Sequence, residues 1–132
     1  MTGRISLVGA GPGAADLLTL RALRCLQAAD VVFYDRLIDP EVIAMAHPGA
    51  ELILVGKHVG AHTWPQERIN DVIVAAALQG KHVVRLKSGD PGIFGRATEE
   101  MSAARAAGIP VELSPGVTAA SAAAVSLGRA LT

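Results

Sequence analysis

The stretch from residue 82 to residue 100, HVVRLKSGDPGIFGRATEE, joins an apolar run, a glycine-rich loop and the start of a helix-like segment. The run at 82–86 has the β-branched and aliphatic side chains that are typical of a strand. The loop at 88–95 contains three glycines and one proline, so it is longer and richer in glycine than a simple strand–helix connection needs. The loop is either a turn or a length of backbone shaped to hold a small molecule. The rest of the chain decides between the two.

The same strand–loop–helix unit is predicted five times along the chain. The other strand-like runs lie at 5–8, 31–34, 52–55 and 111–113, and the helical segments lie at 17–26, 40–46, from 65 onward, 98–107 and 118–127. The runs are too apolar to be exposed on either face, so they predict an α/β fold with a mainly parallel five-stranded sheet and helices on both faces. Ligands of such sheets bind at the carboxyl ends of the strands, and the loops there are predicted to carry the function.

Composition limits the class of protein. With 132 residues, 51% of them hydrophobic and 18% charged, the chain is predicted to be one folded domain. Its 12 basic and 12 acidic side chains cancel, so no overall positive charge favours nucleic acid or a membrane surface as a partner. Cys25 is the single cysteine and lies in a helical pattern, where it is expected to be a small buried hydrophobe. Because no internal disulfide is possible and no apolar run is long enough to span a membrane, a cytoplasmic protein is predicted. The mean hydropathy of +0.39 is high, which indicates either a sheet covered on both faces or an apolar surface that expects a partner.

Two strand-end loops carry residues with more than one interpretation. The loop at 9–13, GAGPG, approaches the G-x-G-x-x-G pattern of dinucleotide-binding folds, and Asp35 follows at the distance of a ribose-binding carboxylate. However, the third glycine comes one residue early and Pro12 lacks the N–H that a pyrophosphate would want. Asp35 beside Arg36 is either a general base or an ion pair that closes a loop.

The loop after the third predicted strand holds three further polar candidates. Lys57 is either a proton donor or a solvated loop lysine. His58 and His62 have the spacing of a metal pair, but Gly60 argues against a helix between them and no third ligand stands nearby, so no metal site is expected.

Six motifs occur in a specific order: GAGPG, YDRL, VGK, PQERIN, RLKSGDPGIFGR followed by EE, and PGVTAAS. In this order and spacing the chain resembles the tetrapyrrole methylase family over residues 5–132. The resemblance implies that residues 1–132 form the N-terminal α/β domain of a two-domain methyltransferase whose second domain is absent from this chain. Among the members, YDRL followed by VGK favours methylation of uroporphyrinogen III to precorrin-2 over the other precorrin methylations, which remain an alternative.

The resemblance also implies a cofactor, a substrate and roles for individual residues. It implies that S-adenosylmethionine is the methyl donor, that S-adenosylhomocysteine is the product, that the substrate is a tetrapyrrole and that the full-length form is a homodimer. Asp35 takes the position of the base and Lys57 that of the proton donor. The positions assigned to the cofactor are Pro12, Ser88, Gly89, Asp90, Ile93, Thr118 and Ala119.

Two departures from the family pattern stand beside these assignments. Gly92 occupies a position where a phenylalanine is common, which removes an apolar contact, and Ala97-Thr98 replaces two glycines at the helix start. The competing hypotheses are a dinucleotide-dependent oxidoreductase that uses GAGPG, and a sensor or assembly module that has kept the fold without catalysis.

Overall fold

A computed structural model of the chain describes residues 2–55, 64–92 and 96–129. Five strands form one sheet in the order β3-β2-β4-β1-β5, and every neighbouring pair is parallel. The strands are β1 Arg4–Gly9, β2 Val31–Tyr34, β3 Glu51–Leu54, β4 His82–Lys87 and β5 Val111–Ser114. The predicted α/β fold with a parallel five-stranded sheet is therefore confirmed.

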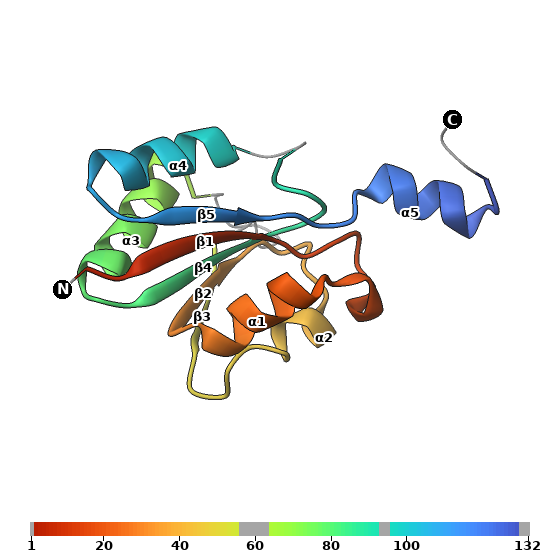
Figure 1. Cartoon of the computed structure of the whole chain (residues 1–132), viewed down its shortest axis with the longest axis horizontal. Helices are drawn as coiled ribbons and strands as arrows, with labels where there is room; N and C mark the ends of the chain where they lie inside the picture. Colours follow the sequence, from red (N-terminus) through yellow and green to blue (C-terminus); the bar gives the residue numbers. More distant parts are fainter. Residues whose placement is uncertain (1, 56–63, 93–95, 130–132) are drawn as a thin grey trace.

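Four helices cover the two faces of this sheet. In Figure 1, α3 (Gln66–Leu78) and α4 (Ala97–Ala106) lie on one face, and α1 (Leu20–Ala28) and α2 (Pro40–Ile43) lie on the other. The helix starts match their sequences: the Thr19 side chain accepts a hydrogen bond from the Ala22 N–H at the start of α1, and Asp39 does the same for Glu41 at the start of α2. No helix in the described part of the chain is long and apolar enough to cross a membrane.

The alternation of side chains along the strands divides the core between the two faces. Ile5, Phe33 and Val83 pack with α3 and α4, whereas their neighbours Val32 and Val84 pack against the side that holds α1 and α2. Because β1, β2 and β4 are central strands buried on both faces, they have the near-continuous apolar runs of a doubly covered parallel sheet.

Two details of the sequence prediction are wrong. The edge strands β3 and β5 are partly exposed, since each has a neighbouring strand on one side only. The leucine pattern at 17–26 does not mark the buried face of α1, because Leu20 is 71% exposed and Leu17 lies in a separate 3₁₀ turn, η1 (Ala15–Leu17). The residues of α1 that face the core are Ala22, Cys25 and Leu26.

The last helix, α5 (Ala119–Ser126), is the exception to this compact arrangement. It projects from the end of the sheet where the strands finish (Figure 1), and none of its residues is buried. Val125 and Leu127 are each 74% exposed. A shallow apolar groove lies between η1 and α5. The high mean hydropathy thus has two sources: a sheet covered on both faces and an apolar helix that is not covered within this chain.

Candidate ligand site at the strand ends

The loops that follow β1 and β4 are joined by backbone hydrogen bonds. The Ala10 N–H donates to the Lys87 carbonyl at 2.7 Å. Gly11 and Gly89 then form a two-way bridge, in which the Gly89 N–H donates to Gly11 at 2.7 Å and the Gly11 N–H donates to Gly89 at 3.1 Å. The glycine-rich loop of the fourth unit is therefore more than a turn, because it pairs with the loop of the first unit.

Glycine is required where the loop after β5 meets the other two. A Cβ on Gly9 would lie 2.7 Å from both the Gly116 nitrogen and the Gly89 carbonyl oxygen, and a Cβ on Gly116 would overlap the same Gly89 oxygen. Gly89 has a φ of +69°, in the left-handed region that favours glycine. Three strand ends thus approach at backbone distance, and they form a structure that we call the strand-end cradle (residues 9–13, 88–92 and 114–119).

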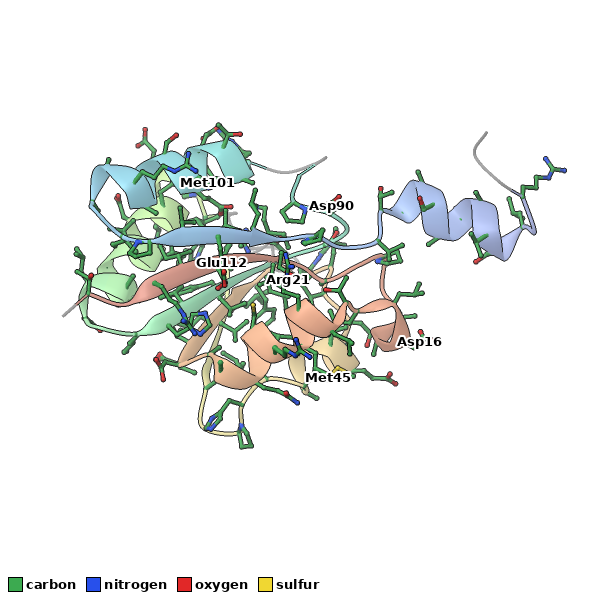
Figure 2. The ribbon with its side chains drawn as sticks, viewed as in Figure 1. Asp16, Arg21, Met45, Asp90, Met101 and Glu112 are labelled. Atoms are coloured by element: carbon green, nitrogen blue, oxygen red, sulfur yellow. The ribbon has the colours of Figure 1, made fainter. Side chains whose placement is uncertain are left out.

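Six of the seven positions assigned to the cofactor fall in the described part of this cradle. Pro12 is half-buried after β1, Ser88 is exposed after β4, and Gly89 and Asp90 are half-buried beside it. Figure 2 shows Asp90 in the loop that leaves β4, at the end of the sheet from which α5 projects. The Asp90 carboxylate accepts a hydrogen bond from the Gly92 N–H at 3.0 Å, which folds this loop back on itself.

The remaining cofactor positions lie at the start of α5, apart from Ile93, which lies outside the described residues. Thr118 precedes the first turn of α5 and Ala119 is its first residue. The Thr118 side chain makes no capping hydrogen bond, so the first N–H groups of this helix are available to another acceptor. Ser114, at the end of β5, is fully buried and its hydroxyl has no partner in the described part of the chain. The uncapped start of α5 beside a glycine-lined cradle fits a small polar ligand better than a closed structural turn.

The dinucleotide alternative does not match the geometry of the first loop. In a dinucleotide-binding fold the glycine loop opens directly into a helix whose N-terminus receives the pyrophosphate. Here the loop continues into η1, and α1 begins only at Leu20, with its first turn capped by Thr19. The chemistry of this cradle is therefore different from that of a pyrophosphate site.

Asp35 lies at the end of β2, next to β4 in the sheet. Its side chain is 32% exposed and accepts a hydrogen bond from Nη2 of Arg85 at 3.0 Å. Arg85 is almost fully buried on the face that α4 covers, and its Nε donates to Glu100 of α4 at 2.9 Å. Lys87 Nζ donates to the other oxygen of Glu100 at 2.7 Å. Asp35, Arg85, Glu100 and Lys87 form one connected set of charges, which we call the charged quartet.

Glu100 is the most buried member of the quartet and carries no exposed surface. Burial alone would raise its pKa. The charges of Arg85 and Lys87, with their hydrogen bonds, outweigh burial and hold the pKa of Glu100 below its ordinary value of 4.5. Glu100, at the centre of the quartet, is therefore ionised at neutral pH although it lies in the core.

Sequence reasoning found Asp35 but missed Arg85, Lys87 and Glu100. The available signal was the position of two cations inside HVVRLK, a strand that is buried throughout. Two buried cations on the same face of a strand require a buried anion. The acidic residues that follow in the sequence are Asp90 in the loop and the two adjacent glutamates at 99–100.

Several predicted polar sites are not tested by the structure. Lys57, His58 and His62 lie outside the described residues. Arg36 is described, and it is exposed. Within residues 2–55, 64–92 and 96–129, no group of three metal-ligating side chains is found.

The fold and the cradle define a class of protein: an α/β domain with a glycine-lined hollow at the carboxyl ends of parallel strands, where ligands of such sheets bind. A family model described as Tetrapyrrole (Corrin/Porphyrin) Methylases matches residues 4–132. The chain belongs to this family, which confirms the resemblance found in the sequence motifs.

Individual relatives agree with this family. The chain is 56% identical to a siroheme synthase 1 of Klebsiella pneumoniae over 131 residues, which cover 99% of this chain and 28% of that protein. It also resembles the crystal structure of uroporphyrin-III C-methyltransferase from Thermus thermophilus, with a TM-score of 0.88, 48% identity and coverage of 100% of this chain and 55% of that one. A further structure of that enzyme, complexed with S-adenosyl homocysteine, matches at a TM-score of 0.74 and 46% identity over 88% of this chain and 46% of that one. The chain thus spans between about a quarter and about half the length of these relatives.

Proposed function

We propose that this chain is the N-terminal domain, residues 1–132, of a two-domain enzyme that transfers methyl groups from S-adenosylmethionine to ring carbons of uroporphyrinogen III to give precorrin-2. The observation that carries the proposal is the strand-end cradle with Asp35 at the neighbouring strand end. The relatives named above support the reaction, and the Thermus complex supports the type of cofactor.

The residues of the cradle fit the methyl donor. Its amino acid and ribose groups need hydrogen-bond partners, and the cradle offers the Ser88 hydroxyl, the Asp90 carboxylate and the first N–H groups of α5. Its adenine and the carbon chain beside the sulfonium need close apolar contact, which Pro12 and the side-chain-free surface at Gly89 provide. When bound, S-adenosylmethionine supplies an electrophilic methyl group attached to a sulfonium.

The protein's part in the reaction is alignment and proton transfer. An electron-rich pyrrole carbon must lie in line with the methyl group, and holding two reactants in such a geometry supplies a large share of the rate enhancement. Methyl transfer leaves the macrocycle cationic, so a proton must then leave. We assign its removal to Asp35, whose carboxylate is partly exposed and fixed at 3.0 Å by Arg85.

Two cationic side chains are proposed for other roles, one as a proton donor and one in substrate binding. Lys57 is proposed as the proton donor, following the family motif VGK. Uroporphyrinogen III carries carboxylate side chains, and the exposed guanidinium of Arg36, directly after Asp35, is placed to meet one of them.

The rest of the cleft is proposed to come from a second domain beyond residue 132. The solved relatives are almost twice as long as this chain, and α5 leaves Val125 and Leu127 exposed without a covering partner in the described part of the chain. We further propose a homodimeric full-length form, a cytoplasmic location and, from the name of the Klebsiella relative, a role in siroheme formation.

Two measurements test the proposed function. Calorimetry of the chain with S-adenosylhomocysteine and with NAD separates a methylase cradle from a dinucleotide site. S-adenosylhomocysteine is expected to bind, and NAD is not. Methylation of uroporphyrinogen III by the full-length protein, measured by the transfer of labelled methyl groups, tests the reaction itself. Binding of NAD in preference to S-adenosylhomocysteine would overturn the proposal.

A further inference from the structure

The guanidinium of Arg85 is held on all three of its nitrogens. Nε donates to Glu100 at 2.9 Å, Nη2 donates to Asp35 at 3.0 Å, and Nη1 donates to the carbonyl oxygens of Leu86 at 3.2 Å and Phe33 at 3.4 Å. These partners come from β2, β4 and α4, so the plane of the guanidinium is fixed relative to both strands. Because Nη2 lies in that plane, its position is set by the partners of the other two nitrogens, above all by Glu100, which binds Nε.

Glu100 has no access to solvent and is shared between two cations. One of its oxygens binds Arg85 and the other binds Lys87, while its neighbour Glu99 points to the surface and pairs with exposed Arg96. A buried ion cluster is a weak source of stability, since packed apolar side chains of the same volume often stabilise as well or better. The arrangement calls for an explanation beyond folding. Within the described residues, Asp35 is the member of the quartet whose side chain has substantial exposure to solvent.

The charges of the quartet balance only when Asp35 is ionised. Arg85 and Lys87 carry two positive charges, and Glu100 and Asp35 carry two negative charges. When Asp35 accepts a proton, the buried part is left with one uncompensated positive charge.

We propose that Glu100 is a positioning residue for the proposed base: it fixes Arg85, Arg85 orients the Asp35 carboxylate, and Lys87 sets the charge against which Asp35 gives up its proton after turnover. This inference rests on the proposed function of Asp35. It adds that α4, which contributes no atom to the cradle, governs the geometry and the protonation of the base through a chain of two contacts.

The test compares two single variants, which change the charge near Asp35 in opposite directions, with the double variant, which leaves that charge balanced. Glu100→Gln leaves an extra positive charge near Asp35, so the acid limb of the kcat–pH profile is expected to move to lower pH. Lys87→Met leaves an extra negative charge and is expected to move the limb to higher pH. The double variant restores the balance and is expected to return the limb toward that of the wild type. For Glu100→Gln, kcat at the plateau is expected to fall by about ten- to a hundredfold because the carboxylate is misplaced, with the KM for S-adenosylmethionine nearly unchanged.

A second readout does not depend on the methyltransferase reaction. The ¹³C carboxyl signal of Asp35 can be followed by NMR across pH in the same variants of this chain. Its transition is expected to move to lower pH in Glu100→Gln and to higher pH in Lys87→Met. Glu99→Gln is the matched control, because it makes the same chemical change one residue away on the exposed side of α4 and is expected to leave the Asp35 transition in place. The exposed Arg36, which faces the same strand end, is unchanged throughout.

The outcomes separate the two proposals. If the wild type carries out no methylation while the NMR transitions shift as expected, the proposed function is wrong and the electrostatic coupling stands. If Glu100→Gln and Lys87→Met shift both readouts in the same direction, or shift neither, the positioning role is overturned. If Glu100→Gln does not fold, Lys87→Met must still move the transition to higher pH and the double variant must still return it toward the wild type; failure of either overturns the role.

Discussion

Gly116 offers the sharpest test of the strand-end cradle, because a single methyl group there meets backbone rather than a flexible side chain. In Gly116→Ala the new Cβ would overlap the Gly89 carbonyl oxygen and lie 3.0 Å from Gly9. Neither neighbour can move freely, since Gly89 is bridged to Gly11 by two hydrogen bonds and Gly9 ends the central strand β1. The loop after β5 must therefore move away from the other two loops.

The size of the effect follows from the kind of contact. Forcing an extra methyl group into a close-packed site costs about 1–3 kcal/mol. For a chain of this length, each kcal/mol corresponds to roughly 3–5 °C in Tm, so the Tm of Gly116→Ala is expected to fall by about 3–15 °C. The same displacement moves the start of α5 relative to Asp90, and the affinity for S-adenosylhomocysteine is expected to fall at least about tenfold, or 1.4 kcal/mol.

Circular dichroism melting and calorimetry of the chain measure both effects. Gly92→Ala is the matched control for stability, because among the described residues its Cβ would meet only the Asp90 carboxylate, at an ordinary 3.4 Å. Its free energy of unfolding is expected to change by no more than about 0.5 kcal/mol. A Gly116→Ala chain that melts and binds like the wild type would refute the close apposition of the three loops.

Four further predictions concern individual groups and the isolated chain. Asp35→Asn in the full-length protein is expected to lower the rate of methyl transfer by about 10²–10⁴-fold with S-adenosylhomocysteine affinity nearly unchanged; loss of binding with normal turnover of the bound complex would contradict its assignment as base. Asp90→Ala is expected to weaken S-adenosylhomocysteine binding in a calorimetric titration, and an unaltered affinity would remove Asp90 from the cofactor site. Burial is the main cause that lowers the pKa of His82 in the folded state. The unfolded chain therefore binds a proton at His82 more readily, and the free energy of unfolding is expected to drop as pH falls below 6.5, the ordinary pKa of histidine. Urea unfolding between pH 7.5 and 5 should show this slope, and His82→Gln should flatten it. The 132-residue chain alone is expected to fold but to methylate uroporphyrinogen III far more slowly than the full-length protein, and equal turnover by a monomeric chain would argue against the second domain.

The fold itself could be read from the order of the elements. Apolar runs such as 82–86 are too short for helices and too apolar for a strand with a wet face, so a parallel sheet covered on both sides was the remaining solution. Local signals placed two of the helix starts, because Pro40 is the first residue of α2 and Pro65 directly precedes α3. The start of α1 at Leu20 was missed, since the predicted helical segment began at residue 17. The strand ends, and hence the place of the cradle, followed from the same pattern.

Pattern alone failed where exposure depends on neighbours that are distant in sequence. The leucines at 17, 20, 23 and 26 have the spacing of a buried face, yet only Leu26 of the four is buried, while Leu20 is 71% exposed. The predicted burial of Cys25 is confirmed. Likewise, nothing within β5 reveals that it is an edge strand. Its exposure is a property of the strand order β3-β2-β4-β1-β5, which is set by how the crossover helices pack.

The sequence by itself determined the fold class, the family motifs and the glycine-rich loops at the strand ends, because these depend on local propensity and on spacing along the chain. Only the tertiary structure decided which strand ends meet and which charges pair. Gly9, Gly89 and Gly116 lie far apart in sequence and become neighbours because β1 runs between β4 and β5. Glu100 becomes the partner of Arg85, and through it of Asp35, because α4 lies on the face of the sheet that holds the Arg85 side chain. Burial then makes that pairing obligatory, since an ion without a counter-ion is too costly to remove from water.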